Sequence, residues 1–431
     1  MTKPIDIGLL GLGTVGTGVA KVLASNADNI AHKIGAPVRI KKILVKNPAK
    51  ARAVKLDAEL TTDIRDILDD KDIAIVVELM GGEEPAKDYI IQALQAGKHV
   101  VTANKDVVSK YGRELFAAAE ENCVDFLFEA SVGGGIPIIR PLKQCLAGNR
   151  ISEVMGIVNG TTNYMLTKMT KEKMDYSAVL AEAQAKGYAE ADPTADVGGW
   201  DAARKIAILA SIAFSTRVTV DDVYVEGITN ITPQDIEYAG ELDYVIKLLA
   251  IARDTDKGVD VRVHPVFLSR THPLASVNDV FNAIFVRGDA VGETMFYGRG
   301  AGEMPTASAV VADIIDVARD IQHQVSSRIL CTCFDTKPLL PVQYTVQPYY
   351  IRLQVADQPG ALAAIAGAFG AQGVSLHSVI QKRKIMADAE IVLITYPVSH
   401  ASMQMALSTL SGLTAVAKIN SVIRVIQEDI G

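Results

Sequence analysis

The stretch 183–205, AQAKGYAEADPTADVGGWDAARK, concentrates the side chains most able to do chemistry. It holds a glycine turn, several carboxylates and a lysine. From Trp200 onward the apolar residues follow helical spacing, which places Asp201 and Lys205 at i and i+4 on one helix face. Such a loop and helix could hold a small zwitterion beside a proton donor. The alternative is an acidic surface loop followed by a solvated pair, which stabilises a helix only slightly.

A glycine-rich turn near the N-terminus predicts a dinucleotide site. It is a GxGxxG motif that follows an apolar strand and opens a helix. The first glycine permits the tight turn, the second lets a diphosphate approach the backbone, and the third lets helix and strand pack closely. The helix N-terminus favours the negative charge of a diphosphate. The alternative is a tight turn without a ligand. The motif consists of Gly11, Leu12, Gly13, Thr14, Val15 and Gly16.

Two lysines follow predicted strands at positions where a nucleotide or substrate could lie. After the second strand comes Lys46, and no acid follows until Asp57. An NAD site would usually carry an acid here for the ribose 2′-hydroxyl, so the sequence favours NADP, with Lys46 facing the 2′-phosphate. NAD binding stays open if Lys46 is only a solvated residue. Lys105 follows the strand KHVVTAN, where it could contact cofactor or substrate or be solvated.

The elements that must position these residues alternate along the first part of the chain. Helical stretches separate the apolar runs IDIGLLG, VRIKKILVK, IAIVVELMG, KHVVTAN and VDFLFEAS. This rhythm predicts a doubly wound parallel sheet, a Rossmann-type NAD(P)-binding domain, over 1–132. The helix at 305–323 could complete this domain, which the sequence leaves open. Residues 133–304 are typical of an α+β domain with a mixed or antiparallel sheet, predicted to hold substrate and to dimerise.

The C-terminal part has a different rhythm. Residues 324–348 form a polar, proline-bearing linker. Over 349–426 the predicted order is strand, helix, strand, strand, helix, strand, which is a ferredoxin-like unit. The fold class is therefore α/β, with a Rossmann-type domain, an α+β domain and a C-terminal βαββαβ unit.

Composition narrows the function classes. The 431 residues are 49% hydrophobic and 22% charged, as in an ordinary globular protein of several domains. A net charge of −7 without a Lys/Arg run argues against nucleic acid as a partner. No apolar stretch approaches the roughly 18 residues that a membrane span needs. The N-terminus enters a strand at once, leaving no room for a signal peptide, so we expect a cytoplasmic protein.

Cysteine and histidine usage points to neither a disulfide framework nor a transition-metal site. The four cysteines are few and scattered, and the C-T-C spacing of Cys331 and Cys333 differs from the CxxC of redox and zinc sites. We therefore expect free thiols. The seven histidines are dispersed and form no HExxH motif.

Together these motifs resemble the homoserine dehydrogenase family, NAD(P)-dependent enzymes that reduce L-aspartate 4-semialdehyde to L-homoserine. GLGTVGTGV, ELMGG, TANK and NGTTNY stand in the order of the family's blocks, and the resemblance covers the whole chain. It implies an oxidoreductase of threonine, methionine and isoleucine biosynthesis. The family signature is matched by Ala183, Gly187, Tyr188, Asp192, Pro193, Asp196, Val197, Gly199, Asp201 and Lys205.

The resemblance also implies roles for single residues. Lys205 would donate a proton to the carbonyl oxygen as hydride arrives, and Asp201 would hold the substrate and orient that lysine. Glu190 would bind the substrate ammonium group. Lys105 would be shared between cofactor and substrate, and the sequence does not settle which lysine donates the proton. Two glycines are implied as backbone contacts to the cofactor, Gly187 and Gly302.

A monovalent cation, sodium, is a further implication of the resemblance. Hard cations take oxygen ligands, here chiefly backbone carbonyls. The alternative is that the glycine cluster 133–135 is only a domain hinge. The implied ligands are Glu129, Val132, Gly134 and Ile136.

The C-terminal unit carries the turn DQPGAL at 357–362, which resembles the ligand-binding turn of an ACT domain. The implied effector is L-threonine, and the alternative is a unit that only mediates subunit association. The resemblance implies a homodimer or homotetramer. For the whole chain the competing hypothesis is a non-catalytic, NADP-binding amino-acid sensor, against which the presence of Glu190, Asp201 and Lys205 counts.

Overall fold

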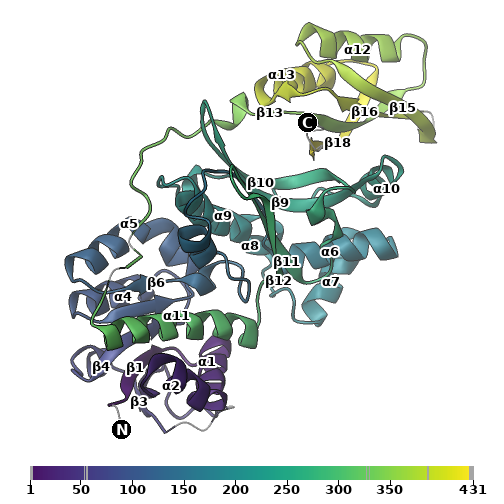
Figure 1. Ribbon diagram of the computed structural model, residues 1–431. Helices are drawn as coiled ribbons and strands as arrows, with labels where there is room; N and C mark the ends of the chain where they lie inside the picture. Colours follow the sequence, from purple (N-terminus) through teal and green to yellow (C-terminus); the bar gives the residue numbers. More distant parts are fainter. Residues whose placement is uncertain are drawn as a thin grey trace. The chain divides into compact units, whose positions relative to one another are not determined.

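The chain divides into two compact units, shown with their helices and strands in Figure 1. The computed structural model describes residues 3–52, 54, 57–326, 328–329, 331–385 and 388–426. Within these residues, every helix is too short or too polar to cross a membrane. The first unit comprises Met1–Val154, Arg204–Val223 and Phe281–Thr336, and the second comprises Met155–Ala203, Tyr224–Val280 and Lys337–Gly431.

The first unit is built on a six-stranded parallel sheet with the order β3-β2-β1-β4-β5-β6. This is the strand order of dinucleotide-binding folds. Successive strands are added on one side of β1 up to β3 and on its other side from β4 onward, and such folds bind their ligands at this switch between β1 and β4. Every residue of β1 is buried, which explains its unbroken apolar run. The strands are β1 (Ile5–Leu10), β2 (Val38–Leu44), β3 (Glu59–Thr61), β4 (Ile73–Glu78), β5 (His99–Thr102) and β6 (Phe126–Leu127).

Helices of distant sequence origin complete the core of the first unit. Helix α11 contributes Ala307, Val310 and Ile314 to the same buried cluster as β1. It approaches α1 so closely that a Cβ on Gly18 would lie 2.6 Å from the Glu303 carbonyl oxygen. The unit also holds the antiparallel hairpin of β11 (Phe281–Gly288) and β12 (Gly292–Arg299). Its helices include α1 (Thr14–Ser25), α2 (Ala27–Ile34), α3 (Arg65–Leu68), α4 (Ala86–Gln95), α5 (Lys105–Glu121) and α11 (Glu303–His323).

The second unit contains strands in the order β9-β10-β18-β14-β16-β15. The long strands β9 (Tyr244–Thr255) and β10 (Gly258–Ser269) pair in antiparallel fashion, and β18 joins β10 in parallel. Helix α9 begins in this unit and continues in the first. The strand β7 (Ile151–Ile157) and the helices α6 (Gly160–Glu172), α7 (Tyr176–Ala185), α8 (Thr194–Val197), α9 (Trp200–Ala213) and α10 (Pro233–Glu241) complete the elements that matter for the site.

The C-terminal elements follow the order β14, α12, β15, β16, α13, β18. The predicted βαββαβ unit is thus confirmed, as is the Rossmann-type sheet of the first unit. Buried residues of both helices and of the strands form one apolar cluster. The elements are β14 (Tyr349–Ala356), α12 (Ala361–Ala371), β15 (Leu376–Ile385), β16 (Asp388–Thr395), α13 (His400–Ser411) and β18 (Val416–Ile426).

A buried ion cluster fixes the C-terminal sheet to α10. Arg352 on β14 donates from Nε to Asp235 Oδ1 at 2.9 Å and from Nη1 to Glu390 Oε2 at 3.1 Å. The Tyr350 and Tyr238 hydroxyls donate to the same two carboxylates. Because Arg352 binds one acid on α10 and one on β16, it holds the C-terminal βαββαβ elements against α10 within the second unit.

Candidate active site

The glycine-rich turn after β1 is shaped by crowding at two of its three glycines. Gly11 has φ +98°, and a Cβ there would lie 2.9 Å from the Leu79 carbonyl oxygen. A Cβ on Gly16 would lie 2.4 Å from the Gly11 carbonyl oxygen. A Cβ on Gly13, by contrast, would meet nothing within 4 Å. The turn therefore needs small residues to form, and it leaves open space beside its middle glycine.

The remaining residues of the motif divide between core and surface. Leu12 and Val15 pack against the apolar core of the unit, whereas Thr14 is exposed. Gly302 precedes α11 with φ +124°, and the next residue, Glu303, forms an ion pair of 2.5 Å with Lys21 of α1. The start of α11 and helix α1 are thereby held side by side.

The loop after β2 presents cations. Lys46 and Lys50 are exposed, and Arg52 is partly exposed. The Arg52 guanidinium donates to the carbonyls of Asn47, Pro48 and Lys50, each at 2.7 Å, and so closes the loop on itself. The chain from 45 to 56 carries no acid.

A buried carboxylate organises the carboxyl edge of β4 and β5. Thr102 Oγ1 donates to Glu78 Oε2 at 2.6 Å, and the Met80 amide donates to Oε1 at 2.7 Å. Burial raises the pKa of Glu78, and these hydrogen bonds oppose that shift. Asn104 then caps α5 by accepting from the Val107 amide at 3.2 Å. This network sets where α5 begins, and its first residue is Lys105.

An ion pair brings the two candidate lysines to neighbouring helical turns within the first unit. Arg204 Nε lies 2.7 Å from Asp106 Oδ1. Lys105 and Lys205 are the sequence neighbours of this pair, on α5 and α9 respectively. Lys205 is buried, and its relative exposure is 9%.

In the second unit, one asparagine holds two acids of the signature together. The Asn159 side-chain amide donates to Asp196 Oδ1 at 2.7 Å and to Asp201 Oδ2 at 2.8 Å. Its carbonyl oxygen caps α6 by accepting from the Thr162 amide. Asp201 stands in the first turn of α9 and is buried. Asp196 and Asp201 thus meet at the start of α6.

The glycine turn of the signature is held to the same helix. Gly187 has φ +72° and is exposed. Thr161 Oγ1 of α6 donates to the Tyr188 carbonyl at 2.7 Å, and the Tyr188 ring packs edge-on against Tyr164. Glu190 is exposed, and Gln184 fixes its backbone by donating to its carbonyl at 3.1 Å. Asp192 serves the backbone, since Oδ1 accepts from the Thr194 amide, and its pKa is lowered by the hydrogen bonds of Thr194.

The segment implied for a cation shows two different behaviours. The Glu129 carboxylate accepts hydrogen bonds from three successive amides, those of residues 138, 139 and 140, at 2.6–2.8 Å. The backbone carbonyls of Val132, Gly134 and Ile136 accept no hydrogen bond from the described residues. Gly134 has φ +55°, and a Cβ there would lie 2.4 Å from the Gly300 carbonyl oxygen. Carbonyl oxygens are therefore present for a hard cation, whereas the Glu129 side chain serves the backbone.

Sequence reasoning missed the residues that organise the site. Asn159 lies in the NGTTNY block, and its signal is the pattern of a helix-capping asparagine. Glu78 lies in ELMGG, where only a charged residue ending a buried strand marks it. Nothing in the sequence couples Asp106 to Arg204, because they are distant along the chain.

Family models match most of the chain. The model described as "Homoserine dehydrogenase, NAD binding domain" matches residues 11–129, and "Homoserine dehydrogenase" matches residues 137–315. The model "ACT domain" matches residues 349–411. The homoserine dehydrogenase of Bacillus subtilis is 46% identical over 98% of both chains. That of Synechocystis is 48% identical over 98% of this chain and 99% of the relative.

Solved structures agree with these matches. A homoserine dehydrogenase from Thiobacillus denitrificans superposes with a TM-score of 0.94 at 43% identity, covering 99% of each chain. A hyperthermophilic archaeal homoserine dehydrogenase in complex with NADPH has a TM-score of 0.62 at 26% identity, covering 73% of this chain and 98% of its own. The family predicted from the motifs is confirmed, and the chain belongs to the homoserine dehydrogenase family.

Proposed function

We propose that this oxidoreductase reduces L-aspartate 4-semialdehyde to L-homoserine with NADPH, and that Lys205 and Asp201 serve the reacting end of the substrate. Family membership favours catalysis over the sensor hypothesis. The observation that carries the residue assignment is that polar partners fix the helical turn of each residue within its own unit. Asn159 holds Asp201 in the second unit, and the Asp106–Arg204 pair holds the turn of Lys205 in the first.

The chain's own residues account for proton delivery. When bound, the nicotinamide cofactor supplies a hydride to the aldehyde carbon. The carbonyl oxygen gains negative charge as the carbon is reduced, and a nearby ammonium group stabilises that charge and donates a proton. We assign this proton to Lys205 Nζ and a cofactor-side role to Lys105. Asp201, one helical turn before Lys205, orients the substrate, and the exposed Glu190 binds the substrate ammonium group.

The cofactor is proposed to be NADPH, held by the turn 11–16 and by Gly187 and Gly302. The open space at Gly13 fits a diphosphate. The cations of the loop after β2, Lys46 among them, fit a 2′-phosphate, and the chain there offers no acid for a free 2′-hydroxyl. An archaeal family member binds NADPH, which supports the same preference.

The remaining proposals concern the cation, the effector, the assembly and the location. Sodium is proposed to bind through the backbone carbonyls of Val132, Gly134 and Ile136, with Glu129 positioning the segment. L-threonine is proposed to bind the C-terminal unit at 357–362. A homodimer or homotetramer is supported by β12, whose alternate residues Met295 and Tyr297 are exposed. Reduced nicotinamide chemistry and free thiols at all four cysteines fit the cytoplasm.

The decisive experiment measures NADPH oxidation with aspartate semialdehyde. Lys205→Ala should lower kcat about 1,000-fold, because a general acid typically contributes 10²–10⁴-fold. Lys105→Ala should raise KM for NADPH more than it lowers kcat. The exposed lysine Lys110→Ala provides the matched control on α5. A wild-type protein without turnover, or an unimpaired Lys205→Ala enzyme, would refute the assignment.

Cofactor preference is tested by the ratio of kcat/KM for NADPH to that for NADH. Lys46→Ala should lower this ratio about tenfold, because one exposed phosphate contact is lost and NADH has no phosphate to lose. Lys33→Ala, an exposed lysine on α2, is the matched control. Equal efficiencies with both cofactors in the wild type would remove the NADPH preference.

A further inference from the structure

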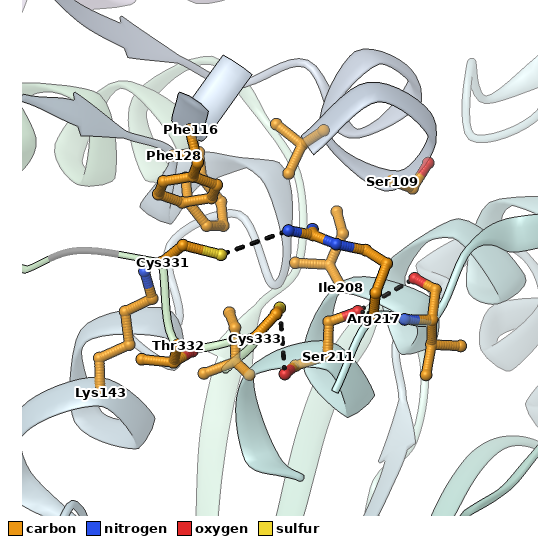
Figure 2. A pocket seen from close by; sticks show the side chains of 13 residues that line it. Ser109, Phe116, Phe128, Lys143, Ile208, Ser211, Arg217, Cys331, Thr332 and Cys333 are labelled. Atoms are coloured by element: carbon orange, nitrogen blue, oxygen red, sulfur yellow. Dashed lines mark hydrogen bonds between the residues drawn. The ribbon is translucent and has the colours of Figure 1, made fainter. Parts of the chain in front are cut away.

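Two cysteines of the first unit, Cys331 and Cys333, line a small pocket (Figure 2). About 20 Å³ of it is open to the centre of a water-sized molecule. That space admits one or two very small polar molecules and excludes anything of peptide size. The Thr332 hydroxyl between the cysteines is buried and has no hydrogen-bond partner among the described residues. The pocket thus has a polar atom available for a small guest.

A guanidinium group is seated against the first sulfur. Arg217 Nη2 donates to Cys331 Sγ at 3.3 Å, the contact drawn in Figure 2. Its other terminal nitrogen occupies space over α5 that exists only because Gly112 lacks a side chain, since a Cβ there would lie 2.8 Å from Nη1. A fixed cation beside a sulfur favours the thiolate over the thiol.

A partly buried lysine faces the same pocket. Lys143 Nζ lies 4.8 Å from the centre of the Phe116 ring and 5.3 Å from that of Phe128. Burial lowers the pKa of Lys143 to about 8, and the two thiols act against that shift. Both a fixed guanidinium and a desolvated ammonium therefore act on the sulfur pair.

The second sulfur is placed as a partner of the first. Cys333 Sγ lies 3.6 Å from the Ser211 carbonyl of α9, to which it can donate. The Asp335 amide donates to the Ser215 carbonyl at 2.8 Å and anchors the segment just beyond. The Cys333 thiol, together with Arg217 and Lys143, lowers the pKa of Cys331 to about 5. A thiolate next to a thiol two residues away is the arrangement of a reacting and a resolving cysteine.

We propose that this pocket is an oxidation site, in which Cys331 reacts with hydrogen peroxide and Cys333 resolves the product as a disulfide. The Cys331 thiolate attacks one peroxide oxygen, the O–O bond breaks, and hydroxide leaves and takes up a proton to form water. The sulfur is oxidised to a sulfenic acid as the peroxide is reduced. The Cys333 thiol sulfur then attacks this sulfur, the S–O bond breaks, and the departing hydroxide takes up the thiol proton and leaves as a second water. Arg217 and Thr332 can stabilise the departing oxygen.

The chain provides its own comparison in Cys123 and Cys145, which are exposed. If exposure alone governed oxidation, these two would react before the half-buried pair. The proposal requires the opposite order. Trypsin does not cleave between Lys337 and Pro338, so cleavage after Arg328 and Arg352 gives one peptide that holds both Cys331 and Cys333. Its disulfide form is recognised as a peptide lighter by two hydrogens that resists alkylation.

The first experiment treats the reduced full-length protein with substoichiometric hydrogen peroxide, blocks remaining thiols and maps the peptides by mass spectrometry. The disulfide in the peptide 329–352 should form before Cys123 or Cys145 is modified. In Cys333→Ser, dimedone should label Cys331 instead. Earlier oxidation of the exposed cysteines, or an unlabelled Cys331 in Cys333→Ser, would overturn the proposal.

The second experiment measures the rate of Cys331 alkylation by iodoacetamide against pH. In the wild type the rate should reach half its maximum below pH 7. Arg217→Gln should move this midpoint upward and slow oxidation at pH 7 about fivefold, since fewer thiolates are present. The control variant Arg113→Gln changes an exposed arginine on α5 and should match the wild type in both midpoint and oxidation rate. Circular dichroism verifies that each variant is folded. A wild-type midpoint at the ordinary value near 8.5, or an unchanged Arg217→Gln profile, would refute the role of the pocket.

Discussion

Two strand-to-helix turns, at 11–16 after β1 and at 357–362 after β14, use glycine in different ways. Both hold a glycine with positive φ, +98° at Gly11 and +87° at Gly360. Around the first turn, a Cβ on Gly11 or Gly16 would strike a backbone oxygen. Around the second, a Cβ on Gly360 would meet nothing within 4 Å. Crowding therefore restricts the first turn, and only backbone conformation restricts the second.

The regions around these turns are also held together differently. Helices α1 and α11 approach through Gly18, whose missing Cβ leaves room for the Glu303 carbonyl. The C-terminal sheet is instead fixed by Arg352 between Asp235 and Glu390. Close backbone packing needs small residues at fixed positions, which leaves a local pattern in the sequence. Charge pairing joins residues with no fixed spacing along the chain, so it leaves no local pattern in the sequence.

The largest expected effect comes from breaking the charge cluster of the second region. Arg352→Met leaves two buried carboxylates without their cation and should lower the free energy of unfolding by about 4 kcal/mol. Urea denaturation measures the change. Arg270→Met removes an exposed pair with Asp243 and should cost at most about 1 kcal/mol. Equal costs for the two variants would contradict the contrast between the regions.

The next effect concerns crowding at the first turn. Gly16→Ala forces a methyl group against the Gly11 carbonyl and should cost about 3 kcal/mol. Gly13→Ala, which faces open space, should leave the unfolding free energy within about 0.5 kcal/mol of wild type. Isothermal titration should nevertheless show weaker NADPH binding by Gly13→Ala. Normal stability in Gly16→Ala would show that crowding does not shape this turn.

A buried carboxyl group in the first region, that of Asp313, should make the free energy of unfolding depend on pH. Burial, reinforced by Glu129, raises the pKa of Asp313 from 3.8 to about 7, although Arg140 opposes the shift. The folded protein thus holds a proton that the unfolded chain releases near pH 4. The stabilisation is complete below pH 4 and is lost as the pH rises toward 7, with a slope of at most ~1.4 kcal/mol per pH unit.

Asp313→Asn should flatten this slope, which urea denaturation at several pH values between 4 and 7 can measure. Asp316→Asn, its neighbour on α11 and another partner of Arg140, is the control that should keep the slope. A wild-type stability that rises with pH across this window would show that Asp313 is ionised in the folded state.

The smallest effect is expected at the second turn. In Gly360→Ala the added methyl group has room, but alanine is strained in a backbone with positive φ. The substitution should therefore lower the free energy of unfolding by about 1 kcal/mol. Gly367→Ala, in the helix interior with nothing near its Cβ position, should raise stability by up to ~1 kcal/mol. Thermal unfolding distinguishes the two by sign. A destabilisation by Gly360→Ala as large as that by Gly16→Ala would erase the difference between the turns.

Features set by local spacing could be predicted from the sequence, whereas contacts between distant segments could not. The GxGxxG turn and the βαββαβ order could be predicted, since each depends on local spacing. Strand β9 was not identified from the sequence. Residues 246–252 are all buried, so the polar alternation that marks a half-buried strand is missing. The hydrogen bonds from Asn159 to Asp196 and Asp201 were also missed. They form only where the start of α6 meets α8 and α9 in space.

The sequence by itself determined the family and the order of the domains, and it supplied the residue types of the proposed site. These depend on short motifs whose spacing is set by strand and helix geometry. Only the tertiary structure decided that Glu129 serves the backbone, that Arg204 pairs with Asp106, and that Arg217 lies against Cys331. Each of these contacts joins segments far apart in the chain. Their distances follow from how whole elements pack, which no local spacing records.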